Sequence, residues 1–171
     1  MKEYQLIKGD VTEPIGDGNK IIAHCTNNLF VMGSGVAFSI KKKWVKVYAQ
    51  YKDWRKQNPQ LGDVQFVKVT PDIAVANILG QDGIGMKDGI APVRYDAMEK
   101  GFKKVAEVAK KFNASVHLPY KIASDRAGGE WSIIEEMIKK TLCEQDVEVI
   151  IYEYNKVDAS LNRREEWEEK T

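Results

Sequence analysis

The strongest constraint on the fold is a regular alternation of short apolar segments with longer helical patterns. Segments with strand character recur at residues 4–8, 20–25, 64–69, 73–79, 115–119 and 147–154. Apolar residues step by three or four positions, as on a helix with one buried face, in residues 36–54, 95–112 and 131–142. This alternation favours right-handed crossovers and a mostly parallel sheet. We therefore expect an α/β fold with three layers, α/β/α.

One pair of strands departs from the parallel pattern. Residues 64–69 and 73–79 are joined by a short turn around Pro71, which is long enough for a hairpin but too short for a crossover helix. The central sheet should therefore be mixed and mostly parallel. We expect a single domain at residues 1–155, followed by a mostly charged tail or short exposed helix at residues 156–171.

Composition limits the classes of function. The chain has 171 residues, 43% of them hydrophobic, which is enough for one domain with a sizeable core. Its 26 basic and 25 acidic side chains nearly cancel, so we expect no general binding to nucleic acid or to anionic membranes. Cys25 and Cys143 lack the spacing of a zinc site or a disulfide framework. Without a membrane-length apolar run or a cleavage signature, a cytoplasmic protein is expected. The oligomeric state stays open.

Polar and glycine-rich segments follow most of the expected strands. In open α/β sheets, ligands bind beyond the carboxyl ends of the strands. The segments that fall there are Asp10, residues 24–35, residues 81–89, residues 122–129, and the end of the last strand at Tyr154 and Asn155. We expect them to share one edge of the sheet and to form a binding crevice.

The junction at residues 22–37, I-A-H-C-T-N-N-L-F-V-M-G-S-G-V-A, is the most suggestive of these segments. Gly33 and Gly35 let a ligand approach the backbone, and the free amides of a helix that begins near Ser34 favour an anion. A tight turn without a ligand explains the two glycines about as well. The Walker pattern is absent and the G-x-G-x-x-G pattern is incomplete, so any phosphate is bound in another way.

Five motifs in this order resemble the macro domain family, which binds ADP-ribose and related nucleotides. They are K-G-D-V-T from residue 8, A-H-C-T-N from residue 23, V-M-G-S-G-V-A from residue 31, A-N-I-L-G-Q-D-G from residue 76, and L-P-Y-K-I followed by A-G-G-E-W from residue 118. The resemblance extends over residues 4–155. It is greatest to the bacterial and phage branch that processes ADP-ribose 1''-phosphate, with a second likeness to the branch that hydrolyses ADP-ribosyl-glutamate.

The resemblance implies a site for ADP-ribose or ADP-ribose 1''-phosphate, without a cofactor or metal. Asp10 would accept a hydrogen bond from the adenine amine beside the Val11 amide, although helix capping is an alternative use of this aspartate. Tyr154 would pack on the adenine ring. Asn27 would bind the distal ribose, and the amides from Gly33 to Val36 the pyrophosphate. The other implied ligand-binding residues are Met32, Ser34, Gly35, Gln81, Ile122, Ala123, Ser124, Arg126, Ala127 and Asn155.

Two side chains are candidates for catalysis, His24 and Asp125. His24 titrates near neutrality and can activate water or protonate a leaving group, but a histidine at the end of a buried strand is more often a hydrogen-bonded core residue. Asp125 can orient or deprotonate water, or it is a solvated loop acid. Arg126 would bind a terminal phosphate or pair with Asp125.

The loop at residues 122–129, I-A-S-D-R-A-G-G, lacks glycines that the family commonly has there, so we expect a more restricted backbone. The glutamate-specific branch uses a lysine where this chain has Gln81, which cannot form a covalent adduct with a sugar; Lys87 is the nearest alternative. The expected function is ADP-ribose binding with metal-independent hydrolysis of ADP-ribose 1''-phosphate. The alternatives are removal of ADP-ribose from a modified macromolecule, and a binding module without catalysis.

Overall fold

The computed structural model describes residues 2–33, 35–125 and 127–154. Three expected site residues, Ser34, Arg126 and Asn155, lie outside the described residues, as does the expected tail at residues 156–171. None of the helices in the described part of the chain combines the length and the apolar character needed to span a bilayer.

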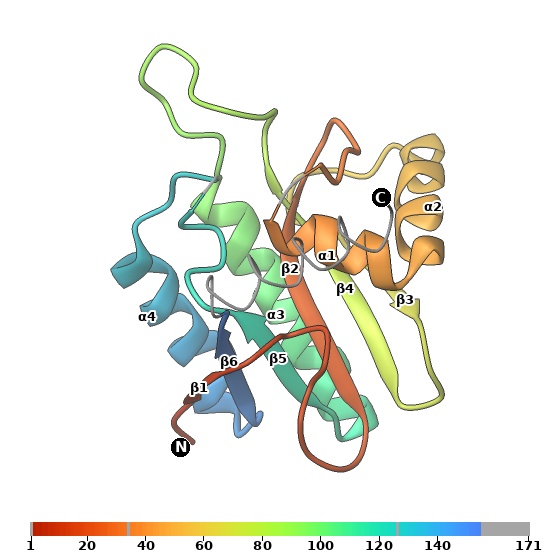
Figure 1. Cartoon of the computed structure of the whole chain (residues 1–171). Helices are drawn as coiled ribbons and strands as arrows, with labels where there is room; N and C mark the ends of the chain where they lie inside the picture. Colours follow the sequence, from red (N-terminus) through yellow and green to blue (C-terminus); the bar gives the residue numbers. More distant parts are fainter. Residues whose placement is uncertain (1, 34, 126, 155–171) are drawn as a thin grey trace, which may run out of the picture.

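A six-stranded sheet with the order β1-β6-β5-β2-β4-β3 forms the middle layer (Figure 1). The strands are β1 (Gln5–Lys8), β2 (Lys20–Asn27), β3 (Val64–Lys68), β4 (Ile73–Gln81), β5 (Ser115–Pro119) and β6 (Val149–Glu153). Every pairing is parallel except that of β3 with β4, which is antiparallel. The expectation of a mixed, mostly parallel sheet with one hairpin is therefore confirmed.

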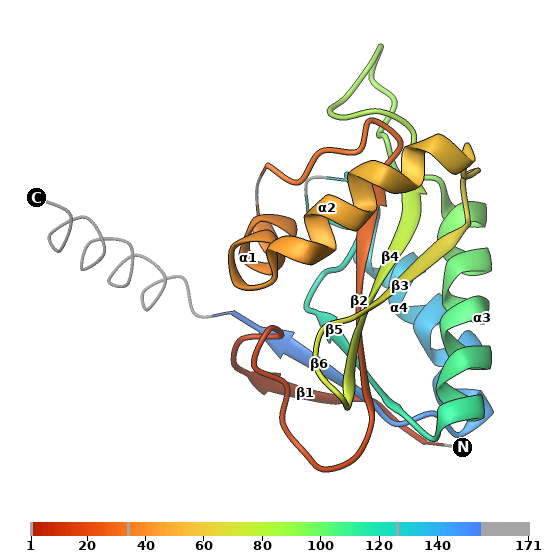
Figure 2. The same ribbon diagram turned by 90° about the vertical axis from the view of Figure 1, so that its right-hand side faces the viewer.

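Helices cover both faces of the sheet (Figure 2). α1 (Gly35–Lys43) and α2 (Val45–Trp54) lie on one face, and α3 (Tyr95–Phe112) and α4 (Trp131–Thr141) lie on the other. Successive strand residues point to opposite faces, so Ile22 packs in the cluster with Tyr51 of α2, whereas Ile21 packs in the cluster with Phe102 of α3. The expected three-layer α/β/α fold is confirmed.

The helical pattern at residues 36–54 forms two helices, not one. The break is at Trp44, whose backbone leaves the helical region at φ −131° and ψ 84°. A straight helix of this length would run about 30 Å in one direction. The break lets the two parts follow different strands, because α1 contacts β2 and α2 contacts β3. The apolar stripe continues through the break because both helices bury the same face in one cluster, so periodicity alone did not reveal it.

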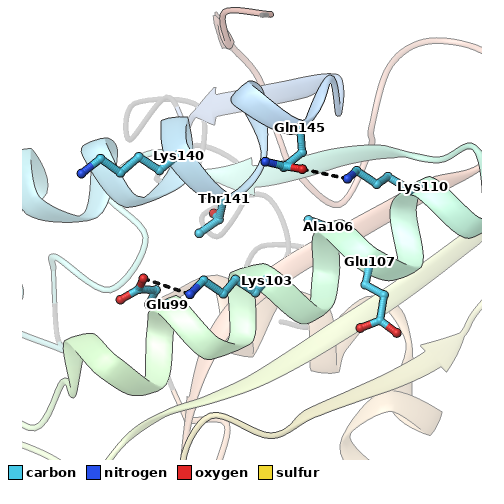
Figure 3. Close-up of a pocket in the computed structure, with 8 residues that line it drawn as sticks. All are labelled: Glu99, Lys103, Ala106, Glu107, Lys110, Lys140, Thr141 and Gln145. Atoms are coloured by element: carbon cyan, nitrogen blue, oxygen red, sulfur yellow. Dashed lines mark hydrogen bonds and ion pairs between the residues drawn. The ribbon is translucent and has the colours of Figure 1, made fainter.

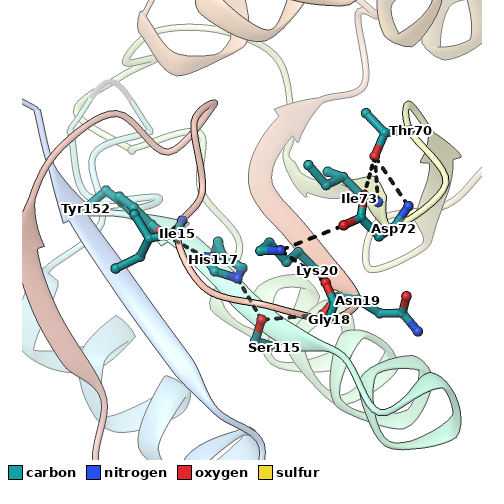
Figure 4. Close-up of polar contacts among 10 residues, drawn as sticks. All are labelled: Ile15, Gly18, Asn19, Lys20, Thr70, Asp72, Ile73, Ser115, His117 and Tyr152. Carbon is teal, nitrogen blue, oxygen red and sulfur yellow. Dashed lines mark hydrogen bonds and ion pairs between the residues drawn. The ribbon is translucent and has the colours of Figure 1, made fainter.

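Residues 9–19 connect β1 to the opposite end of β2 without a helix, and a buried polar chain holds this loop (Figure 4). The Ile15 amide donates to the Tyr152 hydroxyl at 3.0 Å. That hydroxyl lies 2.7 Å from His117 Nδ1, and His117 Nε2 lies 2.8 Å from the Ser115 hydroxyl. Ser115 in turn contacts the Asn19 carbonyl at 3.4 Å. These contacts thus fix the middle of the loop, at Ile15, to β6 and its end, at Asn19, to β5.

Candidate functional site

Five parallel strands end at one edge of the sheet, in the order β1, β6, β5, β2 and β4. The loops after these strands are therefore neighbours although they are far apart in sequence. The loop after β5 lies next to the loop after β2, because these two strands are paired. The structure thus gathers the segments that carry the described candidate residues at one edge, with His24 deeper in β2.

Asp10 and Tyr154 are brought together at the β1 end of this edge. The register pairs Lys8 with Glu153, and the Gly9 amide donates to the Glu153 carbonyl at 3.0 Å. Asp10 and Tyr154 follow directly on these two strands. The Tyr154 side chain is 46% exposed, so its ring is available for packing against a planar ligand.

Asp10 caps a turn, not a helix as the alternative use supposed. Its Oδ1 accepts hydrogen bonds from the Thr12 amide at 2.9 Å and from the Thr12 hydroxyl at 2.7 Å, and its carbonyl accepts one from the Glu13 amide. Within the described residues, neither its second carboxylate oxygen nor the Val11 amide has a hydrogen-bond partner. Capping and ligand binding are therefore compatible uses of the same aspartate.

Asn27 organises the loop between β2 and α1. Its Oδ1 accepts from the Leu29 amide at 3.1 Å, and its Nδ2 donates to the Val31 carbonyl at 3.0 Å. From below, the buried Tyr51 hydroxyl donates to the Asn27 carbonyl and accepts from the Asn27 amide. Burial raises the pKa of Tyr51 above its usual range, so this phenol stays protonated. The ribose contact expected of Asn27 stays a prediction.

The glycines of this loop present open backbone. A Cβ added to Gly33 or to Gly35 would meet no atom within 4 Å, and Gly35 has a positive φ of 61°. α1 begins at Gly35, and its first turn has no acidic side chain. Met32, by contrast, is buried with 1% of its surface exposed, so only its backbone can serve a ligand. Val36 is half-buried in the first turn of α1.

Asn28, which the sequence analysis did not select, joins the loops after β2 and β4. Its Oδ1 accepts from the Gly83 amide at 2.8 Å, and its Nδ2 donates to Asp82 at 3.0 Å. Arg94 lies 3.4 Å from the same aspartate. The hydrogen bond from Asn28, followed by the charge of Arg94, lowers the pKa of Asp82. The polar cluster after β2 pointed to Asn28, but no sequence signal marked Arg94.

The loop after β5 tolerates the missing glycines. Ala123 takes a left-handed conformation with φ 63°, which glycine adopts without strain, and its carbonyl accepts from the Gly129 amide at 2.9 Å. Ile122, Ala123 and Ala127 are buried and anchor the loop. Ser124 is half-buried, and Asp125 is exposed at the tip. Ala123 therefore carries local backbone strain that a glycine at this position would avoid.

His24 lies below the edge, in the interior of β2. It is 2% exposed, and its Nε2 lies 2.6 Å from Asn77 Oδ1. Asn77 Nδ2 donates to Gln65 at 3.0 Å, so Asn77 Oδ1 is the acceptor and His24 Nε2 carries the proton. Within the described residues His24 Nδ1 has no partner. Burial lowers the pKa of His24 to about 4, which leaves the ring neutral at pH 7 and about 10 Å from the end of the strand.

Gln81 ends β4 with its side chain turned to β2, where its Oε1 lies 3.7 Å from the Cys25 thiol. Burial raises the pKa of Cys25 to about 12, so this thiol is not a nucleophile. Lys87 belongs to a tight turn in which the backbones of Lys87 and Ile90 exchange hydrogen bonds of 3.0 and 2.9 Å. Lys87 therefore lies in the turn beyond β4, whereas Gln81 lies at the end of β4 against β2.

The described residues form two hollows, one remote from this edge and one beside it. A groove of about 370 Å³ between α3 and α4 is lined by both lysines and glutamates (Figure 3), and it is remote from the candidate residues. A second, polar pocket of about 360 Å³ lies beside Asn28, between Phe30 and Arg55. Within the described residues, no three side chains of His, Cys, Asp or Glu are grouped to hold a metal ion.

Comparison with known proteins agrees with the fold and with the motifs. No family model matches the chain. A protein of unknown function from Bacteroides thetaiotaomicron is 39% identical, with a TM-score of 0.86 and coverage of 89% of this chain and 98% of that one. The DarTG protein of Thermosipho africanus, solved in complex with ADP-ribose, shares the fold at 20% identity and a TM-score of 0.66 over 78% of this chain and 37% of that one.

Two further similar proteins have names that state the class of protein to which they belong. The zebrafish (Danio rerio) chromodomain-helicase-DNA-binding protein 1-like is 28% identical over 168 residues, and the chain spans only 16% of its length. A macrodomain protein from Streptomyces coelicolor is 38% identical, with a TM-score of 0.78 and coverage of 90% of this chain and all of that one. With this identity over the whole of a macrodomain, and with the same fold, the chain belongs to the macrodomain family.

Proposed function

We propose that the protein binds ADP-ribose along the carboxyl edge of its sheet. The observation that carries this proposal is the placement of Asp10 and Tyr154 at the β1 and β6 end of the edge, with the open glycine loop of β2 on the same edge. A ligand with an adenine at one end and a ribose at the other, joined by a pyrophosphate, fits this order of groups. The ADP-ribose complex of the Thermosipho africanus protein, which has the same fold, supports the choice.

Each part of the ligand has a matching group. The unpartnered oxygen of Asp10 would accept the adenine amine while the Val11 amide donates to a ring nitrogen. The Tyr154 ring would cover the adenine. The backbone from Gly33 to Val36 would hold the pyrophosphate with amides at the start of α1, and the loop of Ile122 to Ala127 would close over the other side. Asn27 would reach the distal ribose.

The proposed reaction is hydrolysis of ADP-ribose 1''-phosphate. Asp125, exposed on the loop beside the glycine loop, would take a proton from water as the water oxygen attacks phosphorus. The bond from phosphorus to the 1'' oxygen breaks, the departing oxygen takes up a proton from solvent water, and Asp125 returns its proton to the solvent as ADP-ribose and phosphate are released. Backbone amides of the glycine loop would stabilise the negative charge that develops. Neutral His24 is unsuited to protonate the leaving group.

Calorimetry with ADP-ribose and AMP tests the binding proposal. ADP-ribose should bind much more tightly than AMP, because only ADP-ribose reaches the glycine loop and Asn27. Equal affinities would remove that loop from the site. Incubation with ADP-ribose 1''-phosphate, with phosphate and ADP-ribose measured separately, tests the reaction. Binding without release of either product would leave a binding module.

A second candidate function is removal of ADP-ribose from a modified macromolecule. It is favoured by the hairpin after β4, where Ile84, Met86 and Ile90 are between 50% and 63% exposed. Exposed apolar side chains on the loop after β4, at the same edge of the sheet, would offer a contact surface to the macromolecule that carries the ADP-ribose. Release of ADP-ribose from a modified protein, but no phosphate from ADP-ribose 1''-phosphate, would select this function.

A further inference from the structure

The balance of charge over the whole chain conceals one strongly basic region. Residues 35–57, which form α1, α2 and the short helix η1 (Arg55–Gln57), carry seven basic side chains and one acidic side chain. The chain has 26 basic and 25 acidic residues in total, so the rest is net acidic. We call the outer surface of these helices the α1–α2 face. It has a local positive field that the total of +1 does not reveal.

The charges of the α1–α2 face are mostly without carboxylate partners. Within the described residues, Lys41, Lys46, Lys52 and Arg55 form no ion pair. The single acid, Asp53, pairs with Lys56 at 2.9 Å. An unpaired cation on a surface is ordinary, but several together repel one another, so an anionic partner would stabilise them.

Helix α3 provides the contrast on the opposite side of the sheet. It also carries several lysines, but Lys100, Lys103 and Lys104 contact Asp63, Glu99 and Glu107 at 3.2 to 3.5 Å. The groove between α3 and α4 has the same mixture of signs (Figure 3). Lysine content alone therefore does not distinguish the two sides of the molecule, whereas the lack of acidic partners does.

The ring of Tyr48 contacts a lysine from each of the two helices. The ammonium of Lys41 lies 4.2 Å from the centroid of the Tyr48 ring, and that of Lys52 lies 4.7 Å from it. These cation–π contacts bring one lysine from α1 and one from α2 to the same aromatic ring. Because these two lysine side chains are already ordered by the ring, they lose less conformational entropy when they contact a phosphate.

Both ends of the α1–α2 face offer more than charge. Phe38, one turn before Lys41 on α1, is 49% exposed, and an exposed aromatic ring can stack an unpaired base. At the other end Arg55 lines the polar pocket of about 360 Å³, together with Asn28, Asn58 and Gln60. This pocket can take a base or a sugar through hydrogen bonds.

We propose that the α1–α2 face binds single-stranded nucleic acid. Unpaired cations would contact the phosphates, Phe38 would stack a base, and the pocket at Arg55 would hold a nucleotide. An anionic membrane would match the charge but not a polar pocket, and an acidic peptide would not use an exposed aromatic ring in this way. The face is separate from the residues proposed for ADP-ribose except at Asn28, which already bonds Gly83 and Asp82.

Fluorescence anisotropy with a labelled single-stranded oligonucleotide of about 12 nucleotides tests the proposal. The test variant is Lys46→Glu with Lys52→Glu, and Lys111→Glu with Lys140→Glu on α3 and α4 is the matched control with the same change in net charge. The test variant should lose at least tenfold in affinity, and the control less than threefold. The slope of log affinity against log salt should become shallower by about 0.7 for each phosphate that the variant no longer neutralises. Phe38→Ala, which keeps every charge, should weaken binding to single strands more than to a duplex.

Other outcomes would overturn the proposal. Equal losses in the test and control variants would mean that only net charge matters. Binding to vesicles with anionic lipid but not to the oligonucleotide would assign the face to membranes, and preferential binding of polyglutamate would assign it to acidic peptides. Saturating ADP-ribose should leave the affinity for the oligonucleotide unchanged. A failure of ADP-ribose binding therefore does not affect this test.

Discussion

At the scale of single residues, Asp10 has two separable roles, one for each carboxylate oxygen. Oδ1 holds the turn through Thr12, and the other oxygen is proposed to accept the adenine amine. Asp10→Asn can keep the turn through its amide oxygen but presents an NH2 group to the adenine amine. We expect it to weaken ADP-ribose binding about tenfold to a hundredfold, the range for a charge-assisted hydrogen bond.

Calorimetry and a urea titration check this prediction together. Asp10→Asn should lower affinity and leave the free energy of unfolding nearly unchanged. Asp17→Asn, an exposed acid in the same loop, is the control and should change neither. If Asp10→Asn keeps the parental dissociation constant, Asp10 has only its structural role.

Substitution of Asp125 or His24 should lower the turnover of ADP-ribose 1''-phosphate more than it lowers the affinity for ADP-ribose. We expect Asp125→Ala to lower turnover about a hundredfold to ten-thousandfold, as for the loss of a general base, with a small change in affinity. His24→Ala should lower turnover and also the free energy of unfolding, because the ring is buried against Asn77. Phosphate release and calorimetry separate these effects, with Asp88→Ala as an exposed control on another loop. Parental turnover in both variants would refute the catalytic assignment.

At the scale of secondary structure, most elements could be predicted because each carries a local pattern. β5 and α3 agree with the expected ranges, since strand alternation and helical periodicity end where the apolar residues end. The break at Trp44 had no glycine or proline to mark it, and tertiary packing of α2 toward β3 accounts for it. The polar chain of His117 and Tyr152 was also missed, because it depends on strands that are neighbours only in the folded sheet.

The contact between α3 and β4 depends on a glycine. A Cβ at Gly101 would lie 2.4 Å from Cγ2 of Ile78, although alanine has the higher helix propensity. Overpacking costs about 1 to 3 kcal/mol and the higher helix propensity of alanine offsets about 1, so Gly101→Ala should lower the free energy of unfolding by up to about 2 kcal/mol in a urea titration. In the Ile78→Ala background, where Cγ2 is absent, the same substitution should be neutral or stabilising. A stabilising effect in the parental background would contradict this packing.

At the scale of the whole molecule, the site is made by topology. The sequence indicated which loops follow strands, and the rule for open sheets placed them on one edge, so Asp10, Gly33, Gly35 and Asp125 could be selected before the structure was known. The order of strands could not be predicted from local patterns, so only the family resemblance indicated that Asp10 and Tyr154 meet, which the pairing of β1 with β6 explains. The depth of His24 also needed the structure, because β2 continues past it to Asn27.

The whole fold should also be sensitive to mild acid through its two histidines. Burial lowers the pKa of His24 to about 4, and burial together with the charge of Lys20 lowers that of His117 to about 4. In the unfolded chain both rings titrate near 6.5. The unfolded state therefore binds more protons below that pH, and stability is lost as the pH falls from about 6.5 toward 4.

This loss can be measured between pH 6 and 5, where carboxylates contribute little. With two protons taken up on unfolding, the free energy of unfolding should fall by up to about 2.7 kcal/mol per pH unit. His117→Gln should halve the slope, since one titrating ring is left. A slope near zero in the parental protein would mean that the histidines are not buried as neutral groups.

The same protonation should loosen the loop of residues 9–19. A proton on His117 Nδ1 would oppose the hydroxyl proton of Tyr152, which holds the Ile15 amide. Amide exchange at Ile15, corrected for the intrinsic rate, should therefore increase over the same pH range.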